Sequence, residues 1–242
     1  MPGKNSDLHG NVPDTAEVAL LLIDVINDLE FDGGDVLLEY ALPAARSIAL
    51  LKRRLKQASL PVIYVNDNFG KWQSDFKKIV SHCLKDHVRG KPIAELLAPE
   101  DDDYFVLKPK HSGFFSTTLD LLIEYLGART LILTGIAGNN CVLFTANDAY
   151  MRDFNIVVPS DCVVSITGED NEYALKQMAQ VLKADTRRST ELDLSEFTKQ
   201  AEGSTTETDA DPDEHPLRIY REGHFGNQEK QQRAATEGGH TR

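Results

Sequence analysis

The sequence predicts an α/β fold, namely a three-layer α/β/α sandwich around a six-stranded, mostly parallel sheet. Short apolar runs alternate strictly with longer segments whose apolar residues recur at helical spacing, the order typical of a parallel sheet covered by helices. The first run, residues 18–23 (VALLLI), is apolar at every position, which is typical of a strand buried on both faces. A chain of 242 residues has room for one such domain with a sizeable core.

The first half of the chain predicts one strand, helix, strand unit and the start of another. After the first strand, residues 43–59 carry apolar side chains at helical spacing, and residues 61–65 (PVIYV) form the second strand. A helix over residues 74–88 and a third strand over residues 104–107 follow.

The second half repeats the alternation. The remaining elements are helices over residues 116–126, 141–152 and 169–183, and strands over residues 130–133, 155–159 and 185–189. Gly127 is a typical C-terminal cap for the first of these helices, and Asn140 is a typical N-cap for the second.

Composition divides the chain into three parts. Residues 1–15 are polar with glycine and proline, and we expect a flexible lead-in before a domain over residues 16–194. Residues 195–242 are acidic and poor in apolar side chains, which predicts a flexible tail. Within it, residues 217–225 (LRIYREGHF) keep some apolar and aromatic side chains, so docking on the domain or on a neighbouring subunit is the alternative for them.

Charge and cysteine usage exclude several classes of function. A net charge of −12 and a pI near 5.0 disfavour nucleic acid and anionic membranes as partners. No apolar run approaches the roughly 18 residues that span a bilayer, and residues 1–15 lack a signal-peptide core, so we expect a cytoplasmic protein. Cys83, Cys141 and Cys162 are widely spaced, which predicts neither disulfides nor a structural zinc site.

Three chemically reactive residues follow strands that should end at the same edge of the sheet. Asp24 follows the first strand, Lys108 the third and Cys141 the fourth, and ligands bind at this edge in open α/β sheets. A thiol in the first turn of a helix lies near unpaired N–H groups and the positive end of the helix dipole, which favour the thiolate. The alternative is that Cys141 is simply a small buried residue. Together the three side chains are the carboxylate, cation and nucleophile that a cysteine hydrolase needs.

The segments around these residues resemble the isochorismatase-like cysteine hydrolase superfamily. They are LLIDVIND, LKPKHSGFFSTTL and TGIAGNNCVLFTANDAYMRDFNIVVPSDC, and the resemblance covers residues 16–191. It implies that Asp24 is the general base, Cys141 the nucleophile and Lys108, rather than Lys110, the neighbouring cation. It also implies a cis peptide between Ile136 and Ala137, and an oxyanion hole made by the backbone N–H groups of Ala137 and Cys141.

The resemblance implies an enzyme that hydrolyses a C–N bond of a small amide or of a ureido or carbamoyl compound through a Cys141 thioester. It implies no cofactor and a homo-oligomer, a dimer or tetramer. The alternatives are a binding module of the same fold without activity and an isochorismatase-type ether hydrolase; Cys141 argues against the latter. Residues 66–69 (NDNF) lack the histidine of the nicotinamidase metal site, so no metal is expected. Ile26 stands where the family usually has glutamine.

Further side chains near the same sheet edge are candidates for the substrate pocket. They are Asn66, Asp67, Phe69, Trp72, His111, Phe114 and Ile136.

Overall fold

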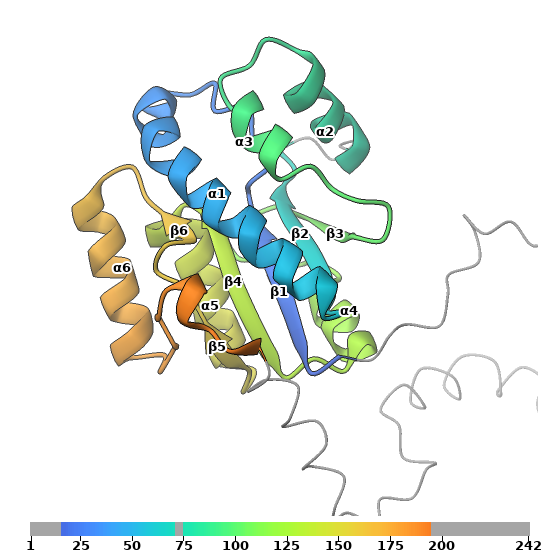
Figure 1. Cartoon of the computed structure of the whole chain (residues 1–242), viewed down its shortest axis with the longest axis vertical. Helices are drawn as coiled ribbons and strands as arrows, with labels where there is room; N and C mark the ends of the chain where they lie inside the picture. Colours follow the sequence, from blue (N-terminus) through green and yellow to red (C-terminus); the bar gives the residue numbers. More distant parts are fainter. Residues whose placement is uncertain (1–15, 71–74, 195–242) are drawn as a thin grey trace, which may run out of the picture. The chain divides into compact units, whose positions relative to one another are not determined.

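A computed structural model describes residues 16–70 and 75–194 of the chain. It contains a six-stranded sheet whose described strand pairs are all parallel, with the order β3-β2-β1-β4-β5 and with β6 also pairing with β4 (Figure 1). The strands are β1 (Val18–Ile23), β2 (Val62–Asp67), β3 (Tyr104–Lys108), β4 (Thr130–Ile136), β5 (Asn155–Val157) and β6 (Val163–Val164). The α/β sandwich predicted from the sequence is therefore confirmed.

Helices cover both faces of the sheet. They are α1 (Gly34–Gln57), α2 (Phe76–Lys85), α3 (Lys91–Leu96), α4 (Leu119–Leu126), α5 (Leu143–Tyr150) and α6 (Gly168–Gln180). In Figure 1, α1 crosses the front of the sheet, with α4 and α5 behind it. Each face has its own hydrophobic core, one packed against α1, α2 and α3 and the other against α4, α5 and α6.

The two cores follow from the alternation of side chains along the central strands. In β1, Leu20 and Leu22 point into the core of the α1 face, whereas Leu21 and Ile23 point into the core of the opposite face. Every residue of β1 and of β4 is buried, which explains why β1 is apolar throughout and why the Thr134 hydroxyl in β4 donates to the Leu21 carbonyl. Burying these strands sets the sheet register, and the register aligns the strand ends that carry the polar residues.

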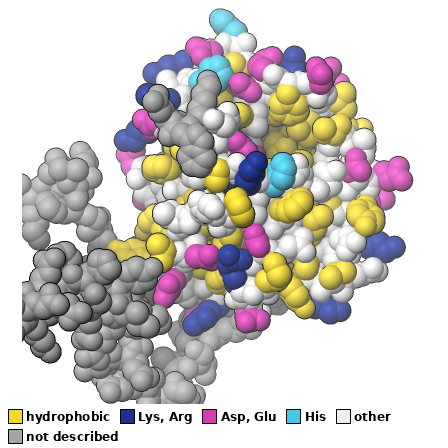
Figure 2. All heavy atoms as spheres, turned by 180° about the vertical axis from the view of Figure 1, so that it is seen from behind, with side chains coloured by type: hydrophobic (Ala, Val, Ile, Leu, Met, Phe, Trp, Pro, Cys, Tyr) yellow, Lys and Arg dark blue, Asp and Glu magenta, His cyan; other side chains and the backbone are white. Residues whose placement is uncertain are grey.

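The face behind the sheet is chemically mixed. Figure 2 shows charged side chains of both signs dispersed among hydrophobic ones on this face. Large hydrophobic side chains remain exposed on and beside α4 and α5; they are Phe115, Leu121, Tyr125, Phe144 and Met151.

The predicted helix starts are partly wrong. α1 begins at Gly34 rather than at residue 43, and Pro43 lies inside the helix. The predicted helix rests on the apolar positions Ile48, Leu51 and Leu55, but buried Leu37 and Ala41 continue the apolar stripe toward the N-terminus. α3 was not predicted at all, because six residues are too few to show a helical period.

The sixth strand is also misplaced in the prediction. It is β6, which pairs with β4 through Val163 opposite Gly135, and not a strand over residues 185–189. That segment contributes one isolated bridge, between Val157 and Asp185, and then a short 3-10 turn over Ser189–Glu191. Two-residue strands carry no alternation, so the sequence pattern could not locate them.

Some predictions concern residues outside the described ranges. The lead-in over residues 1–15, the tail over residues 195–242 and Trp72 all lie there. In residues 16–70 and 75–194, no helix is both long and apolar enough to cross a lipid bilayer.

Candidate active site

The structure brings Asp24, Lys108 and Cys141 into direct contact at the carboxyl ends of three strands. The Lys108 Nζ lies 2.8 Å from Asp24 Oδ2 and 3.4 Å from Cys141 Sγ. Parallel pairing explains the meeting, because Ile23 lies opposite both Val65 and Gly135, and Asp67 lies opposite Lys108. The residues that follow β1 and β4 therefore emerge at the same edge of the sheet as the end of β3.

Asp24 is held in an unusual backbone conformation just beyond β1. Its φ is 51°, in the left-handed region that few residues other than glycine adopt. The backbone N–H of Asp24 donates to the Val65 carbonyl, and its Oδ1 accepts a hydrogen bond of 2.7 Å from the Asp67 N–H. Burial raises the pKa of the Asp24 carboxyl, against the opposing effect of the Lys108 charge and of hydrogen bonds to the carboxylate.

Lys108 is a fully buried cation that depends on its polar neighbours. Its Nζ also lies 3.5 Å from Asp67 Oδ2 and 3.3 Å from the Lys110 carbonyl oxygen. Burial alone would lower the pKa of Lys108, but its electrostatic interactions with Asp24, Cys141 and Asp67 outweigh burial, so the pKa lies above its usual value. Lys110 contributes its backbone carbonyl to this contact.

Cys141 lies within a π-helical turn, Gly138–Val142, that precedes α5. The prediction that Asn140 caps this helix is wrong: Ala137 is the N-cap, and its carbonyl accepts hydrogen bonds from the N–H groups of Asn140 and Val142. Other effects oppose the thiolate that the position of Cys141 at the start of a helix favours. Burial and the charge of Asp24 raise the pKa of the Cys141 thiol to about 12, although Lys108 opposes them.

The raised pKa values of Asp24 and Cys141 indicate a carboxylate and a thiol between which a proton can pass, and not a preformed thiolate. A neutral thiol with a raised pKa lies beside a buried carboxylate, and Lys108 bridges the two groups. The thiol proton therefore has a nearby acceptor, and the thiolate it leaves behind has a nearby cation. This arrangement can generate a sulfur nucleophile at the moment when a substrate arrives.

The turn before Cys141 requires glycine and contains a cis peptide. The bond between Ile136 and Ala137 is cis, at the position that the resemblance implies. Gly135 has φ 118°, and a Cβ there would lie 2.0 Å from the Ile23 carbonyl oxygen. At Gly138 a Cβ would lie 2.5 Å from Asn171 Oδ1. Both glycines thus allow β4 and the π turn to pack closely enough to bring Cys141 to Asp24.

The pocket candidates divide into two groups. Asp67 and His111 adjoin the three side chains: Asp67 through Lys108, and His111 through a 3.9 Å contact from Nδ1 to Cys141 Sγ. Phe69 is 44% exposed just after β2, where its N–H closes a turn on Asp67 Oδ1. It therefore lies on an accessible surface close to the sheet edge.

The other candidates lie in the protein interior. Phe114 and Ile136 belong to the two hydrophobic cores. Asn66 is fully buried and donates from Nδ2 to the Ile26 carbonyl at 2.6 Å, so it fixes the backbone just after Asp24. Its position at the end of β2 was predicted correctly, but the strand alternation turns its side chain toward the α1 face.

Sequence reasoning missed the side chains that support the Cys141 turn. Thr145 Oγ1 donates to the Cys141 carbonyl and accepts from the Gly113 N–H, which joins α5 to the loop after Lys108. Ser165 Oγ accepts from the Asn139 N–H. Thr145 could have been found, because a threonine four residues after a helical residue commonly bonds back to that residue's carbonyl.

Within the described part of the chain, no group of three or more His, Cys, Asp or Glu side chains is arranged to hold a metal ion.

The fold and this site define an α/β protein with a buried carboxylate, lysine and cysteine at the carboxyl edge of a parallel sheet. The family model for the Isochorismatase domain matches residues 18–189, and the chain therefore belongs to the isochorismatase family of hydrolases. The uncharacterized isochorismatase family protein YaaI of Bacillus subtilis is 48% identical over 170 residues, which cover 70% of this chain and 93% of YaaI.

Two further relatives carry names that describe an activity. The ureidoacrylate amidohydrolase RutB of Methylorubrum extorquens is 42% identical over 69 residues, 28% of each chain. The crystal structure of N-carbamoylsarcosine amidase from Thermoplasma acidophilum superposes with a TM-score of 0.56 at 25% identity, covering 73% of this chain and 99% of the amidase.

Proposed function

We propose that this protein hydrolyses a C–N bond of a small amide, ureido or carbamoyl compound through a thioester on Cys141. The observation that carries the proposal is the continuous contact from Asp24 through Lys108 to the Cys141 sulfur, at 2.8 and 3.4 Å. A carboxylate base, a fixed cation and a thiol are the groups that covalent amide hydrolysis requires.

In the first half of the reaction, the Asp24 carboxylate accepts the thiol proton as Sγ attacks the carbonyl carbon. Backbone N–H groups of Ala137 and Cys141 hold the negative oxygen of the tetrahedral intermediate. The C–N bond then breaks, and the proton on Asp24 passes to the nitrogen, which leaves as an amine or ammonia. Lys108 stays protonated and stabilises the negative charge on sulfur and on Asp24 in turn.

In the second half, water attacks the thioester carbon and gives a proton to the Asp24 carboxylate. The S–C bond breaks, the acid product forms, and Cys141 regains the proton from Asp24. The sum is one amide and one water consumed, with one acid and one amine formed. The residues of the site are then back in their starting state without any cofactor.

The named relatives support the choice of bond. RutB is named for ureidoacrylate hydrolysis, and the Thermoplasma enzyme for hydrolysis of a carbamoyl amide, so both names describe cleavage of a C–N bond. We extend to this chain the bond class and not the particular substrate. We also propose a homo-oligomer, since Leu121 and Tyr125 are 57% and 47% exposed on α4; light scattering of the purified protein tests this.

The experiment is a panel of small amides, ureido acids and carbamoyl compounds, assayed for release of amine or ammonia. We expect wild-type turnover of at least one compound and a loss of about a thousandfold or more in Cys141→Ala, because the nucleophile is gone. Cys83→Ala is the matched control, since Cys83 is also a buried free cysteine but lies in the core of the α1 face. Turnover that persists in Cys141→Ala would contradict the covalent mechanism.

A further inference from the structure

A histidine lies on the solvent side of the reactive sulfur. His111 Nδ1 is 3.9 Å from Cys141 Sγ, and the ring is exposed, whereas Asp24 and Lys108 contact the same thiol from the buried side. The sulfur is therefore enclosed between a buried carboxylate and cation and an exposed imidazole.

The backbone that carries His111 is anchored on both sides. The Lys110 carbonyl accepts from Lys108 Nζ at 3.3 Å, and the Gly113 N–H donates to Thr145 Oγ1 at 3.0 Å. Between these points, the Ser112 hydroxyl hydrogen-bonds to Asp148. The loop is thus tied both to the lysine of the site and to α5, the helix that follows Cys141.

The imidazole ring itself has a packing partner. It lies against Phe144 with ring centroids 5.5 Å apart and planes inclined by 41°. Phe144 belongs to α5, three residues after Cys141, so the contact ties the ring to the element that carries the thiol. An exposed histidine held from both its backbone and its ring retains little rotamer freedom, which lowers the entropy lost when it forms a hydrogen bond.

We propose that His111 donates a hydrogen bond from Nδ1 to the Cys141 sulfur and stabilises the thiolate together with Lys108. This inference rests on the proposed function, because it adds a fourth polar side chain to the same site. Lys108 divides its charge among Asp24, Asp67 and the sulfur, so a second donor is needed most when the sulfur is an anion. That occurs during the attack on the carbonyl and again when the thiolate leaves the thioester; His111 keeps its proton in both steps.

Substitutions at His111 distinguish the contribution of its hydrogen-bond donor from that of the packing of its ring. His111→Asn keeps an N–H donor close to the Nδ1 position, His111→Phe keeps a ring against Phe144 without a donor, and His111→Ala removes both. His87→Asn is the control for the same exchange at another exposed histidine. The readout is the rate of Cys141 alkylation by iodoacetamide at a fixed pH well below the thiol pKa, followed on the Cys141 peptide by mass spectrometry.

We expect the alkylation rate to fall about threefold to tenfold in both His111→Ala and His111→Phe, which corresponds to a rise of about 0.5 to 1 unit in the thiol pKa. His111→Asn and His87→Asn should stay within about twofold of the wild type, by the same reasoning. Because alanine opens access to the sulfur and phenylalanine restricts it, a fall in both cannot come from steric effects. Wild-type rates in both variants, or an asparagine variant as slow as alanine, would overturn the proposal.

Alkylation needs no substrate, so the two proposals fail separately. If no amide is turned over but the alkylation rates follow this order, the proposed function is wrong and the role of His111 stands. If amides are hydrolysed and the alkylation rates of all variants equal the wild type, the proposed function stands and the role of His111 is wrong.

Discussion

At the scale of single residues, the site combines two buried charges with a thiol whose pKa is about 12, well above its ordinary value of 9.0. Taking Asp24 and Lys108 out of water has a large free-energy cost, which their mutual contact offsets. At neutral pH the thiolate is a minor species, so the rate of attack depends on how well Asp24 removes the proton. Asp24 therefore raises the pKa of the Cys141 thiol and Lys108 lowers it, so substitutions of the two residues should change the reactivity of the sulfur in opposite directions.

Asp24→Asn should change turnover and thiol reactivity in opposite directions. Turnover should fall about 10² to 10⁴-fold, because the general base is gone. Alkylation of Cys141 at fixed pH should instead become faster, since the Asp24 charge raises the thiol pKa. Both rates are measured on the same preparation, and a slower alkylation would mean that Asp24 stabilises the thiolate.

The pH dependence of wild-type turnover provides a related check. The base works only when ionised, and burial raises the Asp24 pKa above the ordinary 3.8. Activity should therefore fall as the pH is lowered through a value above 3.8, and Asp24→Asn should lose this limb. A limb at or below 3.8 would indicate that the acid limb belongs to another group.

Lys108→Met and Lys110→Met test which lysine acts on the sulfur. Methionine keeps much of the stem's packing and deletes the charge. For Lys108 we expect Cys141 alkylation to slow by about tenfold or more, and unfolding in urea to show a loss of about 3 to 5 kcal/mol, because Asp24 is left buried without its cation. Lys110→Met should match the wild type in both measurements. The reverse pattern would show that the lysine was assigned two residues away from its true position.

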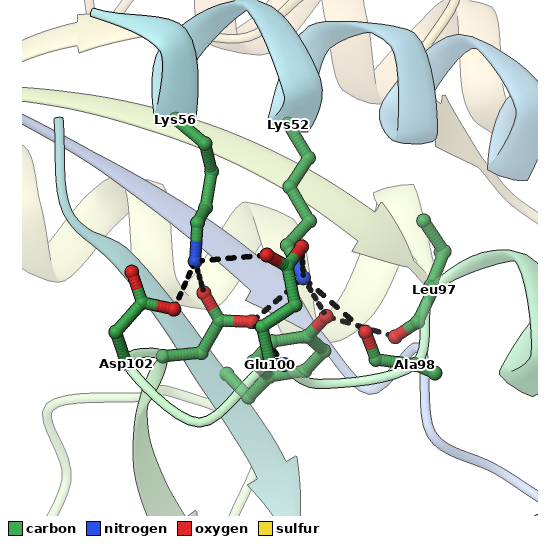
Figure 3. Close-up of polar contacts among 8 residues, drawn as sticks. Lys52, Lys56, Leu97, Ala98, Glu100 and Asp102 are labelled. Carbon is green, nitrogen blue, oxygen red and sulfur yellow. Dashed lines mark hydrogen bonds and ion pairs between the residues drawn. The ribbon is translucent and has the colours of Figure 1, made fainter. Parts of the chain in front are cut away.

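At the scale of elements, a cluster of charges ties α1 to the segment that leads into β3 (Figure 3). Lys52 is almost fully buried, and its Nζ lies 2.6 Å from Asp103 Oδ2, 3.1 Å from the Tyr64 hydroxyl and 3.2 Å from the Ala98 carbonyl oxygen. Lys56 reaches Asp103 Oδ1 at 3.0 Å. Because β3 ends at Lys108, this cluster fixes the start of the strand that carries the lysine of the site.

Lys52→Met should destabilise the fold far more than Lys56→Met. The side chains of Lys52 and Asp103 are 7% and 1% exposed, and removing one partner of a buried ion pair costs about 3 to 5 kcal/mol. Lys56 is more accessible, and two of its partners, Glu100 and Asp102, are 59% and 75% exposed, so its loss should cost about 1 kcal/mol. Denaturant unfolding of the two variants gives both values, and equal losses would contradict a buried role for Lys52.

How much of the molecule the sequence predicts depends on the length of each element. Long apolar runs such as β1 allowed the strands of the sheet to be predicted from the sequence. The ends of these strands then predicted that Asp24, Lys108 and Cys141 lie close together, because parallel strands end at the same edge of a sheet. Two-residue β6 and six-residue α3 were not predicted, since neither is long enough for its period to repeat. The sequence also did not predict the raised pKa of the Cys141 thiol, because burial of the thiol depends on tertiary packing and not on the local sequence pattern.

At the scale of the whole molecule, the domain is closed by the segment that follows α6. Arg54 on α1 donates from Nη1 to the Ser189 carbonyl and from Nη2 to the Leu192 carbonyl, both at 2.6 Å. Leu192 is 2% exposed in the core of the α1 face, and Asp161 accepts from the Ser189 N–H and hydroxyl at 2.7 and 2.8 Å. The family match likewise ends at residue 189. Within the described part of the chain, the segment from Ser189 to Leu194 therefore closes the fold, since Leu194 also packs against the core of the α1 face.

Two truncations test this boundary. A chain ending at Leu194 should unfold at the same urea concentration as the full chain and keep its turnover, because it retains the Arg54 contacts and the burial of Leu192. A chain ending at residue 187 should lose about 3 to 6 kcal/mol, from one buried leucine at about 1.5 to 3 kcal/mol and several hydrogen bonds at about 1 kcal/mol each. Loss of turnover in the Leu194 truncation, without loss of stability, would show that residues 195–242 contribute to the active site. Equal stability of the two truncations would show that the segment after α6 does not close the domain.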